Sequence, residues 1–171
     1  MQKKLKNSSV RVLGIDPGTA TVGWGIVEER DGNFVPVAFG HIATDKKRPE
    51  EARLLEISDD LKEILKKYHP HEAAVEQLFF FKNQKTIIQV GQSRGATLLT
   101  LTQKNVSISG YTPLQVKQSV TGYGKAEKRQ VQSMIKNILK LKSIPKPDDT
   151  ADALALAICH LNSRKIAALT K

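Results

Sequence analysis

"RVLGIDPGTATVGWGIVEE", residues 11–29, is the stretch on which the expected fold depends. A nearly continuous run of β-branched and aliphatic residues ends at Asp16, which is the composition of a strand covered on both faces. Pro17 and Gly18 then supply turn chemistry, and a second apolar run at 22–27 returns after it. The pattern therefore predicts two antiparallel strands, with one carboxylate held at the end of the first.

The glycines near this carboxylate are the second feature of the stretch. Gly18, Gly23 and Gly25 carry no Cβ, so a backbone or a phosphate can approach them closely. A carboxylate in such surroundings suits a metal ion and a phosphate ester. Asp-Pro-Gly-Thr is also a common turn in which Asp bonds its own backbone, so the motif alone leaves both interpretations open.

Length and composition favour one globular domain. The chain has 171 residues, of which 40% are hydrophobic, and we expect a single domain at 10–165, a disordered basic tail at 1–9 and a short tail at 166–171. The lone Cys159 excludes an internal disulfide and a cysteine zinc site. No apolar run is long enough to span a membrane, and the basic start lacks the apolar core of a signal peptide. These features predict a cytoplasmic protein.

The net charge of +10 is unevenly distributed along the chain. Residues 77–147 hold twelve Lys or Arg against the single acid Glu127, while the remaining residues hold fifteen basic and sixteen acidic side chains. A soluble surface usually mixes both signs. One continuous basic part of the chain therefore predicts a face that binds a polyanion, and nucleic acid is the obvious one.

Turn signals and hydrophobic periodicity divide the rest of the chain into alternating elements. They predict, in chain order, a strand at 34–43, a helix at 49–68, a strand at 73–75, a helix at 84–104, a strand at 106–111 and helices at 113–121, 127–140 and 146–165. A strand, a helix and then a strand imply a parallel crossover. The expected architecture is α/β: a five-stranded mixed sheet, three antiparallel strands followed by parallel strands, flanked by helices.

Four carboxylates fall at the ends of these elements. Glu76 follows a short buried strand as Asp16 follows the first, while Asp149 and Asp152 project from one side of the first turn of the last helix. Each has an ordinary explanation, because acids are common at strand ends and at helix N-termini, and Asp148 is expected to be only a cap. Together they would repel one another unless divalent cations bound them. All-oxygen ligands favour Mg²⁺ or Mn²⁺, and a basic surround predicts two-metal phosphodiester hydrolysis.

Other residues are candidates for contacts with nucleic acid or with a second subunit. Three consecutive Phe at 79–81 follow Glu76, and at least one is expected to stack on bases. The Gly-rich basic loop "TGYGKAEKRQ" suits phosphates. Gly91 and Gly95 would each weaken a helix by roughly 1 kcal/mol, so we expect another helix, from the core or from a second copy, to approach them. The candidate DNA contacts are Phe79, Phe80, Lys82, Lys117, Tyr123, Lys125, Lys128 and Arg129.

Five blocks of the sequence, in order and spacing, resemble the bacterial RuvC family of crossover junction endodeoxyribonucleases. They are "GIDPGTATVGWGIV", "AVEQLFFFKN", "GQSRGA", "QVKQSVTGYGKAEKRQVQ" and "DDTADALALAICH". The resemblance implies a ribonuclease H-like fold and a homodimer. It also implies Mg²⁺-dependent resolution of four-way Holliday junctions by paired symmetric nicks that leave 5′-phosphate and 3′-hydroxyl ends, in partnership with a branch-migration motor.

The same resemblance assigns roles to individual residues. Asp16, Glu76, Asp149 and Asp152 would be the metal-binding carboxylates, with two ions per site. Some members carry His where Asp149 stands. Phe79 matches the family's base-stacking aromatic, although Phe80 and Phe81 leave open which Phe stacks. Lys117 and Lys128 match its DNA-contacting lysines, and "GQSRGA" matches its dimerisation region.

Two other functions remain open at this point. An actin-like or sugar-kinase ATPase uses a similar Asp-x-Gly-Thr phosphate loop, but it needs two such lobes and 171 residues hold only one. A module that binds junctions without cutting them, or a relative that acts on RNA, would keep the basic face.

Overall fold

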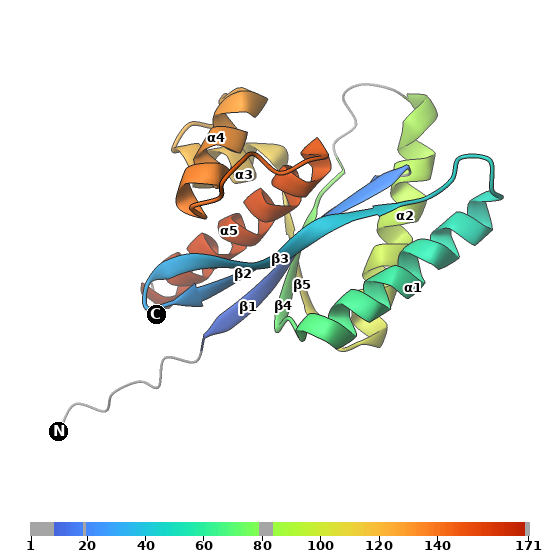
Figure 1. Ribbon diagram of the computed structural model, residues 1–171, viewed down its shortest axis with the longest axis horizontal. Helices are drawn as coiled ribbons and strands as arrows, with labels where there is room; N and C mark the ends of the chain where they lie inside the picture. Colours follow the sequence, from blue (N-terminus) through green and yellow to red (C-terminus); the bar gives the residue numbers. More distant parts are fainter. Residues whose placement is uncertain (1–8, 19, 79–83, 170–171) are drawn as a thin grey trace.

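The computed structural model describes residues 9–18, 20–78 and 84–169 of the chain. A five-stranded sheet with strand order β3-β2-β1-β4-β5 forms its centre (Figure 1). The first three strands pair antiparallel, and β4 and β5 run parallel to β1, so the predicted mixed sheet is confirmed. The strands are β1 (Val10–Asp16), β2 (Thr21–Arg30), β3 (Asn33–Ala43), β4 (Glu72–Glu76) and β5 (Ser107–Tyr111).

Five helices flank this sheet within the described residues. α1 and α2 pack on one face, and α3, α4 and α5 pack on the other (Figure 1). All the predicted helices are present, and α5 extends beyond the end expected for the domain at 165. The predicted tail at 1–9 lies, except for its last residue, outside the described residues. The helices are α1 (Glu50–Tyr68), α2 (Gln84–Gln103), α3 (Pro113–Thr121), α4 (Lys128–Ile138) and α5 (Asp148–Leu169).

The central strand β1 contributes to two separate apolar cores, because successive side chains of a strand point to opposite faces of the sheet. Leu13 and Ile15 face α1 and α2, and Val12 faces α5. All three are fully buried. This two-sided burial explains why the sequence of the first strand is a nearly continuous apolar run.

Among the described residues, none of the helices has the length and apolar character needed to cross a membrane.

Local signals fix the ends of the shorter elements. Thr112 caps α3 with a capping box to Gln115, and Pro113 occupies the first helical turn, as the sequence predicts. Gly122 ends the helix with a φ of 75°, a left-handed conformation that glycine adopts without steric cost. The loop that follows therefore leaves α3 at a defined point and leads into α4.

The contact between α5 and the sheet is unusually close. An ideal Cβ on Gly14 of β1 would lie 1.8 Å from the Ala153 carbonyl oxygen, and one on Gly23 of β2 would lie 2.0 Å from the Asp149 carbonyl oxygen. No real side chain tolerates such distances. The backbone of α5 therefore lies directly on β1 and β2. Of the three glycines selected from the sequence, Gly23 is approached by this backbone, whereas Gly18 faces the Thr21 carbonyl and Gly25 faces the Leu154 side chain.

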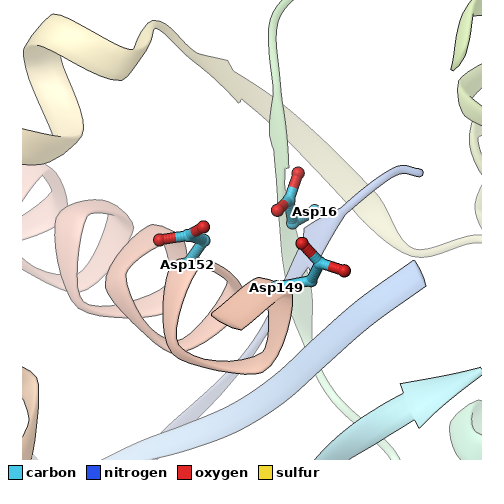
Figure 2. Close-up of side chains that lie close together, drawn as sticks. All are labelled: Asp16, Asp149 and Asp152. Atoms are coloured by element: carbon cyan, nitrogen blue, oxygen red, sulfur yellow. The ribbon is translucent and has the colours of Figure 1, made fainter. Parts of the chain in front are cut away.

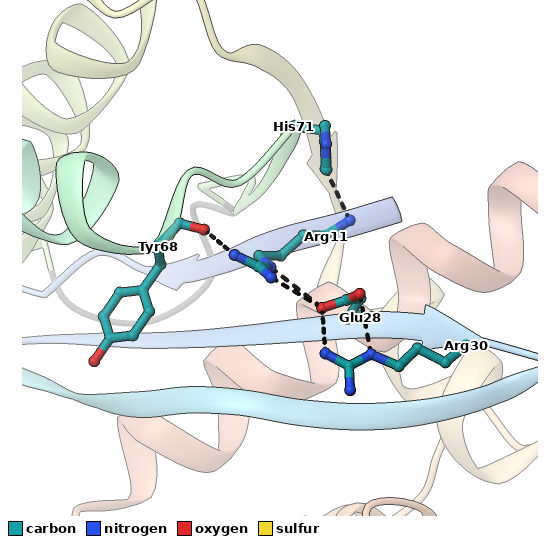
Figure 3. Close-up of polar contacts among 5 residues, drawn as sticks. All are labelled: Arg11, Glu28, Arg30, Tyr68 and His71. Atoms are coloured by element: carbon teal, nitrogen blue, oxygen red, sulfur yellow. Dashed lines mark hydrogen bonds and ion pairs between the residues drawn. The ribbon is translucent and has the colours of Figure 1, made fainter. Parts of the chain in front are cut away.

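The far end of the sheet is held by an ion cluster around Glu28, which is 4% exposed (Figure 3). Its Oε2 lies 3.0 Å from Arg30 Nη2 and 3.1 Å from Arg11 Nη2. The hydrogen bond from Arg30 lowers the pKa of Glu28 to about 2, against the opposing effect of burial. Arg11 also donates to the carbonyl of Tyr68, and its backbone N–H donates to His71 Nδ1 at 3.1 Å. The cluster thus ties β1 and β2 to the end of α1.

Changing Gly14→Ala tests the close contact. We expect the variant to lose about 3 kcal/mol or more of folding stability, because the new methyl group must displace the backbone of α5. Urea or thermal unfolding measures this loss. Gly40→Ala is the matched control: its Cβ would meet the movable Trp24 ring at 3.1 Å on the opposite face, so its cost should be clearly smaller. Equal stability of the two variants would contradict the interpretation.

Candidate active site

Three aspartates meet at one edge of the sheet (Figure 2). Asp16 stands at the end of β1, and Asp149 and Asp152 stand in the first turns of α5. One carboxylate oxygen from each lies within 4.8 Å of the other two. The start of α5 is fixed to the sheet, since the Thr150 hydroxyl donates to the Gly40 carbonyl of β3 at 3.1 Å. Segments more than 130 positions apart in the chain are thereby brought to one site.

Glu76 joins this group through Asp16. β4 lies parallel beside β1 with Ile15 paired to Val75, so both strands deliver a carboxylate at the same edge. The side chains of Asp16 and Glu76 are hydrogen-bonded to each other. The structure therefore brings together all four predicted carboxylates. Their role in catalysis stays a prediction.

Burial and neighbouring carboxylates raise the pKa values of three of these acids, Asp16, Glu76 and Asp149. Burial, followed by the charges of Glu76, Asp152 and Asp149, raises the pKa of Asp16 to about 8. Burial also raises the pKa of Glu76, although the hydrogen bond from Asp16 opposes the change. Near neutral pH the Asp16–Glu76 pair therefore retains one proton.

Asp149 is affected by the same causes and by two nearby bases. Burial raises its pKa together with the charges of Asp152 and Asp148, while Lys128 and His41 act in the opposite direction. His41 was not among the residues selected from the sequence. Its influence on Asp149 shows that β3, as well as α4, contributes to the surroundings of the carboxylates.

Lys128 lies against the carboxylates. Its Nζ is 3.0 Å from Asp152 Oδ2 and 3.6 Å from Asp148 Oδ2. Burial alone would lower the pKa of Lys128, but the hydrogen bond and the charge of Asp152 raise it above its usual value. Asp148 begins α5 and also pairs with Lys146 at 3.1 Å. It is therefore held by lysines and lies outside the group of three aspartates.

The donor set fits a hard divalent cation. All of its potential ligands are carboxylate oxygens, which Mg²⁺ and Mn²⁺ prefer and which suit zinc less well. Bringing four acids together in a partly buried place costs free energy unless positive charge is supplied. Lys128 supplies only one positive charge. The arrangement can hold divalent ions beside a phosphate ester.

Two residues that support the site were not selected from the sequence. Ser93 of α2 donates from its hydroxyl to the Gly18 carbonyl at 2.7 Å, and Arg94 donates from Nε to the Glu76 carbonyl at 3.0 Å. They hold the backbone just after β1 and at the last residue of β4. The signal in the sequence was a polar stripe on the buried side of α2, where Ser93 and Thr97 are fully buried.

The predicted nucleic-acid contacts divide into three groups. Lys128 adjoins the carboxylates, and Lys117 is half-buried on α3. Tyr123 is 59% exposed, and Lys125 and Arg129 are exposed at the α3–α4 connection and the start of α4. Phe79, Phe80 and Lys82 lie outside the described residues.

The outer side of α2 carries an apolar stripe. Ile88 is 69% exposed and Leu99 is 60% exposed, and a Cβ on Gly95 between them would meet open space. A Cβ on Gly91 would instead lie 3.8 Å from Leu78. Of the two predicted glycines, Gly95 therefore lies on the open side of the helix, and Gly91 faces the chain's own Leu78.

A sequence model described as crossover junction endodeoxyribonuclease RuvC matches residues 12–160. The chain belongs to the RuvC family. Membership makes it an endodeoxyribonuclease, which confirms the resemblance noted in the sequence. The RuvC protein of Caldanaerobacter subterraneus subsp. tengcongensis is 50% identical over 92% of this chain and 95% of its own length. The RuvC protein of Fusobacterium nucleatum subsp. nucleatum is 52% identical over 90% of this chain and 81% of its own length.

Solved structures agree with this assignment. Thermus thermophilus RuvC superposes on this RuvC-family chain with a TM-score of 0.85 at 33% identity, covering 92% of this chain and 97% of its own. The same protein in complex with a Holliday junction substrate superposes with a TM-score of 0.88, again at 33% identity, and the match covers 92% of this chain and 96% of that chain. The yeast mitochondrial resolvase Ydc2, 15% identical with a TM-score of 0.65 over 91% of this chain and 81% of its own, shares the fold. The fold is thus ribonuclease H-like, as predicted.

The raised pKa of Asp16 predicts how stability depends on pH without metal. Between about pH 4 and about pH 8 the folded protein keeps a proton that the unfolded chain has lost, so stability falls as pH rises through this window. At pH 8, Asp16→Asn should therefore be more stable than the parent by at least about 1 kcal/mol, or about 2–4 °C in Tm. At pH 4 the gain should vanish. Thermal unfolding in a chelator measures both.

Asp148→Asn is the matched control for this comparison. The hydrogen bond from Lys146 lowers the pKa of Asp148, so its removal should give no gain in stability at pH 8. Added Mg²⁺ should raise the Tm of the parent more than that of Asp16→Asn, because ligand binding to the folded state stabilises it. A parent more stable than Asp16→Asn at pH 8 in chelator would contradict the assignment.

Proposed function

We propose that this chain resolves four-way DNA junctions by divalent-metal-dependent hydrolysis at the four-carboxylate site. The observation that carries the proposal is the meeting of Asp16, Asp149 and Asp152 within 4.8 Å, with Glu76 hydrogen-bonded to Asp16. Family membership supports the substrate, since a relative 33% identical has been solved with a Holliday junction. Recombination and repair of DNA in the cytoplasm would be the setting.

Asp16, Glu76, Asp149 and Asp152 would hold two Mg²⁺ ions, for which Mn²⁺ could substitute. When bound, such a pair supplies an activated water and stabilises the leaving oxygen of the phosphodiester. The protein's own part is to keep the four oxygen ligands in place through the end of β1, the end of β4 and the start of α5. Asp16 must also lose its proton, so cleavage should rise with pH through the neutral range.

Lys128 has a second function in this scheme. Its ammonium group neutralises Asp152 in the structure, and Asp152 can turn fully to a metal only when this pair opens. The released lysine then lies beside the site, where it can bind a DNA phosphate. Lys117, Tyr123, Lys125 and Arg129 extend the basic surface along α3 and α4, and Phe79, Phe80 and Lys82 are proposed to contact bases and backbone next to Glu76.

The outer stripe of α2 supports a homodimer. Exposed Ile88 and Leu99 lie on either side of the open Gly95 position, so a second copy can pack its own α2 against them. Because an isologous dimer places two identical sites about a two-fold axis, it matches the symmetry of a four-way junction and yields paired nicks. A branch-migration motor is the proposed further partner.

Changing Asp16→Asn tests the catalytic proposal. Cleavage of a synthetic four-way junction in Mg²⁺ should fall by at least about a thousandfold, the scale of losing a group that acts within a catalytic unit. Binding of the junction without metal should persist, because the variant keeps the basic surface. Gel analysis of nicked strands and fluorescence anisotropy give the two readouts. Asp60→Asn, on the exposed side of α1, is the matched control and should cleave like the parent.

Several outcomes of this experiment decide between the alternatives. Cleavage retained by Asp16→Asn would remove the four-carboxylate site from catalysis. A parent that binds junctions but cuts none of them in Mg²⁺ or Mn²⁺ would indicate a binding module. In a separate titration, saturable binding of ATP to the parent protein would favour an actin-like ATPase.

Changing Leu99→Glu tests the dimer. The charge should be tolerated on a monomer but not within an apolar interface, so sedimentation should show a shift from dimer to monomer. Junctions should then be nicked on one strand, and not on both strands within one encounter. Leu55→Glu is the control, because Leu55 on α1 is equally exposed at 59%. A parent that is monomeric with junction bound would overturn the dimer proposal.

A further inference from the structure

His41 lies in a row with Asp16 across three strands. Asp16 of β1 pairs with Gly23 of β2, and Gly23 pairs with His41 of β3. Directly opposed residues of antiparallel strands project to the same face of the sheet. The following residue, Ile42, packs in the core beneath α1 and α2. His41 therefore points to the other face, which is the face that carries the carboxylates.

The first turn of α5 lies between the two ends of this row. Gly23, the middle member, has no side chain, and the Asp149 carbonyl occupies the place of its Cβ. Thr150 is hydrogen-bonded to the carbonyl of Gly40, the residue just before His41. Asp149 is thus flanked by Asp16 on one side and by His41 on the other.

The side chain of His41 is exposed and makes no ion pair with an acid in the described part of the chain. Two strand spacings separate the Asp16 and His41 backbones by about 10 Å. Within the described residues, the group of potential metal ligands comprises Asp16, Asp149 and Asp152 and does not include His41, so the imidazole stands beside the carboxylates without belonging to that group. The other histidines are placed differently: His71 accepts from Arg11, His160 is buried against Glu72, and His69 follows α1 at the far edge.

The charges around His41 indicate what it can bind. Lys128, on α4, covers the Asp152 side of the carboxylates, whereas the Asp149 side faces β3 and carries His41. A DNA strand whose scissile phosphate lies at the carboxylates extends in two directions. One direction passes Lys128, and the other passes His41. On the β3 side, the ring N–H of His41 is a donor that can reach a phosphate oxygen.

We infer that His41 binds the cleaved DNA strand by donating a hydrogen bond to a phosphate next to the scissile one. This inference rests on the proposed function and deepens it by naming a contact on the β3 side of the site. The contact fixes the register of the strand over the carboxylates. His41 is thus a substrate-binding residue that neither holds metal nor replaces a carboxylate.

The test uses junctions in which single phosphates flanking the cleavage point are replaced by neutral methylphosphonates. With the unmodified junction, His41→Ala should cleave about three- to tenfold more slowly at subsaturating enzyme, the scale of one lost hydrogen bond. One methylphosphonate position should slow the parent by a similar factor and slow His41→Ala no further. His41→Gln, which keeps an N–H donor, should recover part of the rate. His69→Ala is the control and should match the parent.

Binding measured on the Asp16→Asn background gives a second readout that needs no cleavage. There, His41→Ala should weaken junction binding, and the same methylphosphonate should remove the difference between the two proteins. Lys117→Ala serves as the positive control for a lost phosphate contact, with an effect at another position of the strand.

The outcomes separate this inference from the function on which it rests. Equal methylphosphonate sensitivity of the parent and His41→Ala at every position would overturn the phosphate contact, as would an unchanged rate. A higher Mg²⁺ requirement of His41→Ala, with no dependence on a particular phosphate, would assign His41 to the metal instead and also overturn it. If Asp16→Asn still cleaves, the proposed function itself has failed; if it is inactive while His41→Ala behaves as the parent, only the contact is lost.

Discussion

α5 lies directly on β1 and β2 because Gly14 and Gly23 leave no side chain between the helix backbone and the sheet. Most helices pack on a sheet through side chains, at a distance set by their size. Here the backbone of the helix fills the space that a methyl group would take, so the helix has one permitted height over the strands. That height brings its first turn level with the end of β1 and determines where Asp149 and Asp152 stand relative to Asp16.

The site formed in this way is electrostatically unfavourable on its own. Four acids share a partly buried place, and burial together with mutual repulsion raises the pKa values of Asp16 and Glu76. The cost is met elsewhere in the fold: two apolar cores cover both faces of the sheet, and the Glu28 cluster binds the far ends of β1 and β2 to α1. Functional sites commonly retain such local conflict, because binding of the ligand relieves it.

Much of this arrangement could be predicted from local patterns in the sequence. A buried run that ends in Asp16, a crossover that returns a parallel strand to Glu76, and the three-residue spacing of Asp149 and Asp152 each follow from the geometry of one element. The capping box at Thr112 is equally local. These features need no knowledge of which surfaces meet.

The features that could not be predicted depend on contacts between distant elements. Ser93 and Arg94 look like ordinary polar residues of a Gly-containing helix until α2 is placed against the turn after β1 and the last residue of β4. The position of His41 beside the carboxylates follows only from the register of three strands. Lys128 was predicted to contact DNA, and its pairing with Asp152 depends on how α4 packs beside α5.

α2 has two sides with different tasks. Its inner side holds, through Ser93 and Arg94, the backbone directly behind Asp16 and Glu76, while its outer side presents Ile88 and Leu99 to whatever packs there. A helix is stiff, so a small displacement of its outer side also moves its inner side. A second copy packed on the outer side, as proposed, would therefore contact the same helix that holds the ends of β1 and β4, and dimer formation would be linked to the alignment of the carboxylates.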